Sequence, residues 1–485
     1  MSERKDAIVI GGGVGGLVAA TYLARAGRSV LLLEAETSVG GACRASSSIA
    51  GIRSGFAGSA LYALDPRIVT DLDLRELKFA VRDMLSVALR EDGRHLVLGR
   101  DAQPAFRAIA PQSSQDAQSY RKLREEIFAL AHAMRPFWWE AANTPALHDA
   151  AQAQLLPRLA VTSAASYLSV LESDALRSML AFDAGKPLES GSALALVWRA
   201  AQEMCGLQGA VATIQSGPVA LIKVLTNAVR KAGVDIRTRA RVERMRLDGN
   251  SVTGVVLDTG EEIAGRSVLS GLTRRATLLN LAPTASAGFA ETQKLMRAAP
   301  RAGEALVLFL LNAIPDFGGA NIPQTARFVI ADRLDDFAEA TTAVRDGILP
   351  DNLLLEVTVP TAADPALAPS GQHVVSVRVT RLPLAPKQGW PALTGKLFEK
   401  VVTALERHTP HLREGLLAID ARMPVEEEPE SGTRLMTAYA ERINTPIEGL
   451  FLCGASAEPM NAISGRAGRL AAGIANAFLA RKKGP

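Results

Sequence analysis

The chain has 485 residues, of which 48% are hydrophobic and 21% are charged, so it is long enough to bury two or more cores. Its net charge of +4 is modest for this length, and its basic residues are scattered, which argues against nucleic acid as a partner. The three cysteines, Cys43, Cys205 and Cys453, lie far apart without C-x-x-C spacing. This fits a reducing cytoplasm, without disulfides or a zinc site.

The sequence gives no sign of export or of a membrane span. The N-terminal residues MSERKD contain no apolar signal core, and the apolar run from Ala305 to Pro315 is shorter than the roughly 20 residues of a transmembrane helix. We therefore expect a cytoplasmic location. Trp138 and Trp139, next to Phe137, leave open an apolar tunnel or peripheral contact with a membrane surface, and a helix core explains them as well.

Ala7 to Ile10 form an uninterrupted apolar run, which predicts a strand buried on both faces of a parallel sheet. Gly11, Gly13 and Gly16 follow in G-x-G-x-x-G spacing. In that pattern the first glycine permits a tight turn, the second lets the backbone approach a pyrophosphate, and the third lets helix and strand pack closely. The N-terminus of the next helix then offers N–H groups to the phosphates.

The second predicted strand, Ser29 to Leu33, ends at Glu34, where a carboxylate can accept both hydroxyls of an adenosine ribose and would repel a 2′-phosphate. Gly40 and Gly41 follow shortly after. The string from Ala7 to Ala42 resembles the FAD-binding fingerprint of the amine oxidase, carotenoid desaturase and GDP-dissociation-inhibitor clan. This resemblance implies FAD as the cofactor, in preference to a nicotinamide cofactor or a purely structural turn.

In the middle of the chain, the spacing at which residues of one type recur changes to that of a helix. Arg, Glu and Leu recur at three- and four-residue spacing from about Ser114 to Trp198, which predicts a helical insertion. Ser216, just ahead of Pro218, is predicted to cap a helix that runs to Lys231.

Strand signals come next, at 234–238, on both sides of a hairpin at 248–250, and at 267–271. This order resembles the middle part of the same clan, where the chain returns to its FAD domain, and the resemblance places Val242 at the adenine. A second excursion, about 272–445, is the predicted substrate domain. Its strand signals are ALVLFLL, FVIAD, NLLLEVTVP and HVVSVRVT.

The C-terminal part of the chain is expected to return to the FAD-binding domain as its third segment. GLFLC, from Gly449 to Cys453, predicts one more buried strand, with Gly454 at the edge where an α/β sheet holds its ligand. A helix is predicted after Ser464, and its N–H groups and positive dipole end would stabilise a reduced flavin. The alternative is a tightly packed terminal helix without that role.

The stretch PIEGLFLCGASAEPMNAISGRAGRLAA resembles the C-terminal signature of carotenoid (phytoene) desaturase-like FAD-dependent oxidoreductases. GFAGSALYALDPRIVTDLDL and VPTAADPALAPSGQHVVSV are similar to one branch of them, the pyridine nucleotide-disulphide oxidoreductase domain-containing protein 2-like proteins. The resemblance implies an α/β fold. A discontinuous Rossmann-type FAD-binding domain would comprise 1–70, 206–271 and 446–485, and an α+β substrate domain, 272–445, would carry a helical insertion, 71–205.

Departures from that family bear on the substrate. Where the family has His-Pro-Gly-Gly-Gly-Val, this chain reads EPMNAI from Glu458 to Ile463, so three positions gain side chains beside the expected flavin. Ala42 stands where amine oxidases and many desaturases have arginine, and the segment from Glu430 to Thr445 is shortened. The family's substrates are therefore not carried over to this chain.

The fingerprint and the resemblance together imply a set of residues at the FAD. They are Gly11, Gly13, Val14, Gly15, Gly16, Glu34, Ala35, Gly40, Gly41, Ala42, Ser59, Ala60, Val242, Gly454, Ala455, Asn461, Ala462 and Ile463.

No catalytic acid or base is assigned. Glu458 stands where the family has histidine and is one candidate, with a solvated loop acid as the favoured alternative. Tyr62, in the GSALY turn, is a second candidate and is as consistent with a core residue. The six histidines form no ligand cluster, and Pro410 separates His408 from His411, so no metal is expected.

After the N-terminal turn, no second G-x-G-x-x-G follows a strand, so no site for NAD(P)H is apparent. We therefore predict an FAD-dependent, desaturase-like oxidoreductase that takes hydride from an organic, apolar or conjugated substrate, with oxygen, a quinone or another compound as acceptor. An amine or amino-acid oxidase is the first alternative. A binding protein like the GDP-dissociation inhibitors, without catalysis, is the second, and the intact glycines and Glu34 favour the enzyme. The oligomeric state is not predicted.

Overall fold

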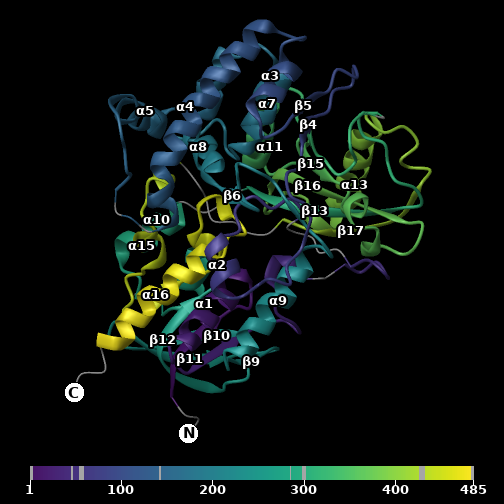
Figure 1. Cartoon of the computed structure of the whole chain (residues 1–485). Helices are drawn as coiled ribbons and strands as arrows, with labels where there is room; N and C mark the ends of the chain where they lie inside the picture. The colour runs from purple at the N-terminus through teal and green to yellow at the C-terminus, as the bar shows by residue number, and fades with distance from the viewer. Residues whose placement is uncertain are drawn as a thin grey trace.

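The computed structural model describes residues 4–44, 47–53, 59–140, 142, 144–283, 286–297, 302–319, 321–424 and 432–481. Residues 55–58 of the GFAGSALY motif and 430–431 of the shortened segment lie outside them. Figure 1 shows three regions: a sheet at the bottom near both chain ends, a second sheet at the right, and a group of helices at the top.

The first sheet combines three distant parts of the chain. Its strands are β1 (Lys5–Ile10), β2 (Val30–Leu33), β9 (Asp235–Arg237), β10 (Val242–Asp248), β11 (Ser251–Leu257), β12 (Glu262–Ser270) and β18 (Leu450–Leu452). The order is β10-β11-β12-β1-β2-β9, with β18 paired to β12. The pairs that join β9, β2, β1, β12 and β18 are all parallel, whereas β10, β11 and β12 form an antiparallel meander. These strands confirm the strand and hairpin predictions, with β12 longer than expected.

Three helices cover the parallel part of this sheet. Helix α1 (Val14–Arg25) contacts both α9 (Pro218–Lys231) and α16 (Arg466–Arg481). The predicted cap of α9 is wrong, because Gly217 and not Ser216 precedes the first helical residue. Gly217 and Ser216 both have positive φ, 71° and 64°, and the Ser216 amide donates to Asp364 Oδ2 at 2.7 Å. The chain therefore turns sharply into α9, and Asp364 holds that turn.

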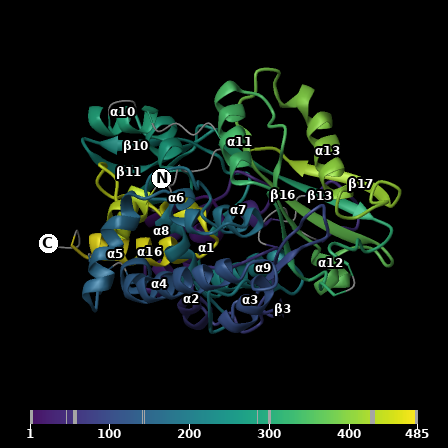
Figure 2. The same cartoon turned by 90° about the horizontal axis from the view of Figure 1, so that it is seen from above.

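The second sheet also joins distant segments. Its strands are β4 (Ser86–Ala88), β5 (Leu96–Leu98), β13 (Ala302–Leu311), β14 (Arg327–Ile330), β15 (Leu354–Thr358), β16 (His373–Pro383) and β17 (Leu416–Arg422), in the order β17-β13-β16-β15-β14-β4-β5. All pairs are antiparallel except β14 with β4. Helices α11 (Leu334–Asp346) and α13 (Trp390–Glu406) lie beside it in Figure 2. The hairpin β4–β5 was not predicted, because each strand has only three residues.

The expected helical insertion is present. Its helices are α3 (Ala102–Ile109), α4 (Ser114–Trp139), α5 (Ala150–Val161), α6 (Ala164–Tyr167), α7 (Asp174–Asp183) and α8 (Ala193–Ala201). The remaining short elements are α2 (Pro66–Asp71), β3 (Phe79–Val81), β6 (Glu203–Met204), β7 (Leu207–Gln208), β8 (Thr213–Ile214), α10 (Phe289–Arg297), α12 (Pro360–Ala363), α14 (Gly432–Leu435) and α15 (Tyr439–Ile443).

Trp138 and Trp139 belong to the core of this helical region. They are 1% and 7% exposed, and the Trp138 indole N–H donates to the Leu435 carbonyl at 2.9 Å. The ring of Trp139 lies under the guanidinium groups of Arg135 and Arg466, at 4.1 and 4.6 Å. The structure thus supports the core interpretation and excludes membrane contact through these two side chains.

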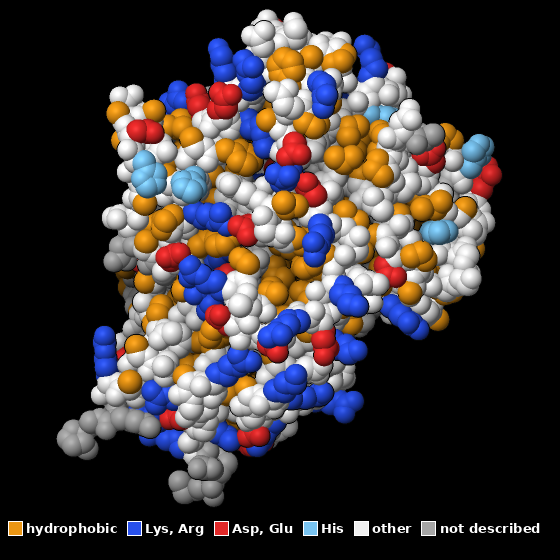
Figure 3. Space-filling view, viewed as in Figure 1, with side chains coloured by type: hydrophobic (Ala, Val, Ile, Leu, Met, Phe, Trp, Pro, Cys, Tyr) orange, Lys and Arg blue, Asp and Glu red, His pale blue; other side chains and the backbone are white. Residues whose placement is uncertain are grey.

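The face seen in Figure 3 carries basic side chains interspersed with acidic ones. This distribution agrees with the small net charge of +4. Within the described ranges, no helix combines the length and the apolar character that crossing a membrane requires.

Candidate dinucleotide site and an adjoining charged cavity

The loop between β1 and α1 is built from glycines that the protein's own packing requires. Gly11 has φ of 91°, a left-handed conformation that glycine adopts without a steric penalty. A Cβ on Gly16 would lie 2.0 Å from the Gly11 carbonyl oxygen, and a Cβ on Gly15 would lie 2.0 Å from the Cys453 carbonyl oxygen. The third glycine of the motif therefore lets α1 approach β1, and Gly15 lets it approach the end of β18.

Gly13 is different, because neither packing nor backbone conformation requires glycine there. Its φ and ψ are −70° and 176°, which any residue adopts, and a Cβ at this position would meet no atom within 4 Å. Gly13 borders a cavity at the N-terminus of α1. The open space in front of it suits a group that must approach the backbone closely, as a pyrophosphate does.

Glu34 lies in the same cavity at the end of β2. It is 8% exposed. Its Oε2 accepts from the Gly12 amide at 2.7 Å, and its Oε1 accepts from the Glu36 amide at 2.9 Å. Two backbone donors thus fix the carboxylate, and each oxygen keeps further acceptor capacity for a ribose hydroxyl.

Fifteen of the 18 residues predicted at the FAD line this one cavity: Gly11, Gly13, Val14, Gly15, Gly16, Glu34, Ala35, Gly40, Gly41, Ala42, Val242, Gly454, Ala455, Ala462 and Ile463. Ala60 and Asn461 line a neighbouring cavity instead, and Ser59 is in the lining of neither. The prediction missed nine further residues of the lining: Ile10, Leu33, Cys43, Ala240, Arg241, Gly271, Leu272, Ser464 and Gly465. Cys43 directly follows the predicted run from Gly40 to Ala42, and this position next to the motif was the available signal for it.

Glu458 is buried, so the favoured interpretation as a solvated loop acid is wrong. It is 2% exposed and lines the cavity. Its Oε2 accepts from the Tyr439 hydroxyl at 2.7 Å, and its Oε1 accepts from the Ala467 amide at 2.6 Å. Burial and this carboxylate raise the pKa of Tyr439 well above its usual range, so the phenol remains a proton donor to Glu458.

This contact changes the expected role of the start of α16. The Arg466 amide donates to Ser464 Oγ at 2.9 Å, and the Ala467 amide donates to Glu458. A carboxylate therefore occupies part of the positive helix end that was expected to face a reduced flavin.

Cys43 and Cys453 are also buried, and burial raises the pKa of both thiols to about 12, which makes them inert as nucleophiles.

The cavity at the N-terminus of α1, lined by Gly13 and Glu34, is called the dinucleotide cavity below. The loop from Glu458 to Ile463 separates it from a second, charged cavity. Glu458, Ala462 and Ile463 line the first, and Met460 and Asn461 line the second. Met460 and Asn461 have positive φ, 57° and 50°, at two positions where the resembled signature has glycine. This backbone conformation is disfavoured for both side chains, and the loop keeps it where the two cavities meet.

The charged cavity lies against the second sheet and the helical region. Its ionisable lining comprises Asp183, Lys186, Arg199, Glu304, Arg327, Glu356, Arg378 and Arg381, together with Tyr62. Glu356 on β15 connects two of the arginines: Arg327 contacts its Oε2 at 2.5 Å and Arg378 at 3.2 Å. Although burial opposes ionisation, these guanidinium groups lower the pKa of Glu356 to about 2.

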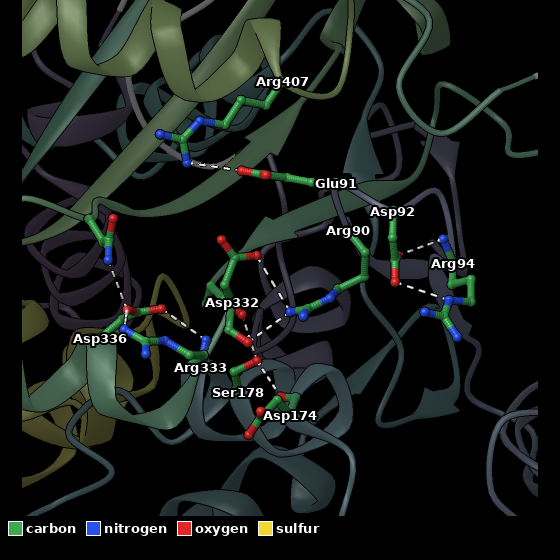
Figure 4. A network of polar contacts seen from close by, with 12 residues as sticks. Arg90, Glu91, Asp92, Arg94, Asp174, Ser178, Asp332, Arg333, Asp336 and Arg407 are labelled. Atoms are coloured by element: carbon green, nitrogen blue, oxygen red, sulfur yellow. Dashed lines mark hydrogen bonds and ion pairs between the residues drawn. The ribbon is translucent and has the colours of Figure 1, made fainter.

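Figure 4 shows a polar network that involves α7 and the segments after β4 and β14. Ser178 on α7 donates to the Ala331 carbonyl at 2.6 Å, and Arg90 donates to the Asp332 carbonyl at 2.7 Å. The first contact ties α7 to the segment after β14, and the second ties the segment after β4 to that same segment. Asp183, the last residue of α7, is thereby held at 2.6 Å from Arg327.

A Glu356→Gln variant should lose about 3–5 kcal/mol of unfolding free energy at pH 7, because it leaves two buried guanidinium groups without their shared carboxylate. The shift of the Glu356 pKa from 4.5 to about 2 corresponds to about 3 kcal/mol. Since the folded pKa is the lower one, this contribution is present above pH 4.5 and is lost as the pH falls towards 2. Urea denaturation of both proteins at several pH values measures it.

The matched control is Glu399→Gln, which removes an exposed carboxylate paired with Arg413 and should change stability by no more than about 0.5 kcal/mol. Equal losses in the two variants would contradict the assignment of Glu356 to a buried network.

The histidines were not expected to bind a metal. His408 is buried and His411 is exposed, both after the end of α13. Among the described residues, no three His, Cys, Asp or Glu side chains are grouped so that they could hold a metal ion.

Comparison with known proteins places this architecture. A family model described as flavin containing amine oxidoreductase matches residues 14–276, more than half of the chain. The chain belongs to the flavin-containing amine oxidoreductase family. This confirms the resemblance to that clan, and the α/β fold described above agrees with it.

Individual relatives agree with this assignment. Rat pyridine nucleotide-disulfide oxidoreductase domain-containing protein 2 is 28% identical over 98% of this chain and 94% of its own length. A redesigned putrescine oxidase shares the fold with a TM-score of 0.65 at 18% identity, over 99% of both chains. A Rab GDI from Plasmodium falciparum shares it with a TM-score of 0.55 at 10% identity, over 97% of this chain and 98% of its own.

Proposed function

We propose that this member of the flavin-containing amine oxidoreductase family is an FAD-dependent enzyme that takes hydride from an organic substrate held in the charged cavity. The observation that carries the proposal is Gly13. Its missing side chain leaves open space in a cavity that also holds Glu34, and packing gives no reason for a glycine there. When bound, FAD supplies the hydride-accepting ring.

The chain's own residues would bind FAD, orient the substrate and exclude water from both. The 11–16 loop would receive the diphosphate with its amide groups, and Glu34 would accept the ribose hydroxyls. The loop from Glu458 to Ile463, between the two cavities, would set the distance between the substrate and the flavin. Alignment of a C–H bond and exclusion of water are the main requirements of such a step, so a side-chain base such as Glu458 or Tyr62 is optional.

The apolar or conjugated part of the predicted substrate has a place beside the charged cavity. A second pocket, which shares Asp183 and Arg199 with it, is lined mainly by apolar side chains that include Leu123, Phe128 and Met179. A hydrocarbon portion would bury its surface there. Oxygen, a quinone or another compound would then accept the electrons.

The two alternatives fit less well. An amine or amino-acid oxidase would bind the ammonium group of its substrate, and the arginines of the charged cavity disfavour a cation. A GDI-like binding protein needs no FAD, whereas Gly13 and Glu34 retain the space and the acceptor that FAD uses.

We expect purified protein to carry non-covalent FAD, seen as absorbance near about 450 nm, and to keep that absorbance under anaerobic NADPH. The organic substrate should bleach it without any nicotinamide, because only one dinucleotide motif is present in the sequence. An anaerobic screen of organic compounds measures both. Protein that stays colourless after incubation with FAD would contradict the proposal that it is an FAD-dependent enzyme. Rapid bleaching by NADPH would contradict the proposal that the organic substrate supplies the electrons.

A further inference from the structure

The charged cavity has more cations than anions. Its lining includes Lys186, Arg199, Arg327, Arg378 and Arg381 as cations and Asp183, Glu304 and Glu356 as anions, which is five against three. Lys186 pairs with Glu189, outside the lining, at 3.4 Å. The excess therefore resides in the arginines.

Two of these four arginines are fully compensated. Arg327 contacts Asp183 at 2.6 Å and Glu356 at 2.5 Å. Arg378 contacts Glu304 at 2.9 Å and Glu356 at 3.2 Å. All three carboxylates of the lining are engaged by this pair, so these side chains form a closed network within the wall.

Arg199 and Arg381 have no carboxylate partner among the described residues. Arg199 on α8 has a buried Nη1 without any hydrogen-bond partner in the described structure, and its guanidinium lies over the ring of Tyr62 at 4.1 Å. Arg381 donates to Thr341 Oγ1 and to the Gly185 carbonyl, and its buried Nε has no partner in the same part of the chain. A buried charged donor left unpaired carries a large desolvation cost.

Burial lowers the pKa of Arg199 from its usual range, yet an arginine in a protein keeps its proton. The group is therefore a cation in a cavity whose carboxylates are already engaged. An anion brought by a ligand would remove the cost, and the planar guanidinium fork matches a carboxylate in geometry.

We propose that the charged cavity binds the carboxylate of an organic-acid substrate, with Arg199 as its principal partner and Arg381 as the second cation. This inference rests on the proposed function and adds the chemical class of the substrate. Tyr62 would keep the guanidinium plane in place through its ring, as a positioning residue. The apolar pocket that shares Arg199 with this cavity would take a hydrocarbon part of the same acid.

Isothermal titration calorimetry of the FAD-loaded protein with acetate, benzoate and hexanoate tests the proposal, with hexanamide and hexylamine as neutral and cationic counterparts. At least one acid should bind and raise the melting temperature, and the amide and the amine should not. Arg199→Met should weaken binding of that acid about 10- to 100-fold, and Arg199→Lys should lie between it and the wild type.

Melting temperatures separate a binding role from a structural one. Without ligand, Arg199→Met should melt at or above the wild-type temperature, because it removes an unpaired buried charge. Arg413→Met is the matched control, since it removes an exposed arginine that pairs with Glu399 and Glu406 and should leave acid binding unchanged.

Three results would overturn the proposal: binding of none of the acids, equal binding of hexanamide and hexanoate, or unchanged acid affinity in Arg199→Met. Preferential binding of hexylamine would also overturn it, in favour of an amine oxidase. FAD content is read independently from the flavin absorbance, so loss of flavin refutes the proposed function, and loss of acid binding in the yellow protein refutes only the substrate class.

Discussion

A Gly13→Val variant is expected to lose FAD while it keeps its fold. In the protein alone, a Cβ at Gly13 meets no atom within 4 Å, and the extended backbone there, with φ of −70°, suits valine. The isopropyl group would instead occupy the space that a pyrophosphate needs. A clash of about 1–3 kcal/mol, added to the lost amide contacts, should lower FAD affinity about 100-fold or more.

Flavin absorbance after desalting measures retention, and circular dichroism and the melting temperature of the FAD-free proteins measure the fold. Gly16→Val is the matched control, because its Cβ would lie 2.0 Å from the Gly11 carbonyl oxygen. That variant should lose both FAD and stability. A yellow Gly13→Val protein with wild-type affinity would show that the cofactor binds elsewhere.

The second large effect is expected at Ala462. Its side chain is 4% exposed and lines the dinucleotide cavity, in the loop whose other face lines the charged cavity. Ala462→Trp should reduce turnover about 100-fold or more, because a displacement of about 1 Å between reacting groups already has that effect. FAD affinity should change only a few-fold, since the diphosphate contacts are expected in the 11–16 loop.

The measurement is kcat together with FAD affinity, with the compound that bleaches the flavin anaerobically as substrate. Ala462→Leu provides a smaller step in case tryptophan disturbs the loop, and it should fall between the wild type and Ala462→Trp. Ala462→Gly, which introduces the glycine of the resembled signature, should keep turnover within a few-fold. Wild-type turnover in both bulky variants would place the flavin ring away from this loop.

The cavity at the N-terminus of α1 could be predicted in part because many of its residues lie close together in sequence. A strand, a glycine-rich turn, a helix and an acid at the end of the next strand all lie within residues 5–34. Each part obeys a short-range rule, and the run from Gly11 to Ala42 supplied ten of the fifteen predicted residues that line the cavity. The C-terminal strand and the family resemblance supplied the other five. Ser59, Ala60 and Asn461 were placed by resemblance alone, and the cavity lining does not include them.

The charged cavity could not be predicted in the same way. Arg199 comes from α8, Glu356 from β15 and Arg378 from β16, and only the register of the second sheet places Glu356 opposite Arg378. A signal was nevertheless present. A charged residue inside an apolar strand, such as the glutamate in NLLLEVTVP or the arginine in HVVSVRVT, needs a partner when it is buried.

Glu458 was misjudged for a related reason. Its burial depends on Tyr439 and on the start of α16, and neither contact can be read from the loop sequence. The prediction that Ser216 caps α9 was wrong for a similar reason. Ser216 has a positive φ, and its amide donates a hydrogen bond to the distant Asp364.

The close approach of Gly15 to the end of β18 has a consequence for how the protein is made. Gly15 touches Cys453, and a Cβ on Gly468 would lie 2.2 Å from the Gly15 carbonyl oxygen. The glycine-rich turn between β1 and α1 is therefore supported by residues synthesised more than four hundred positions after it. Until α16 has been synthesised, this turn lacks its support in the nascent chain and is accessible to chaperones. We therefore expect the protein to bind flavin only after α16 has been made.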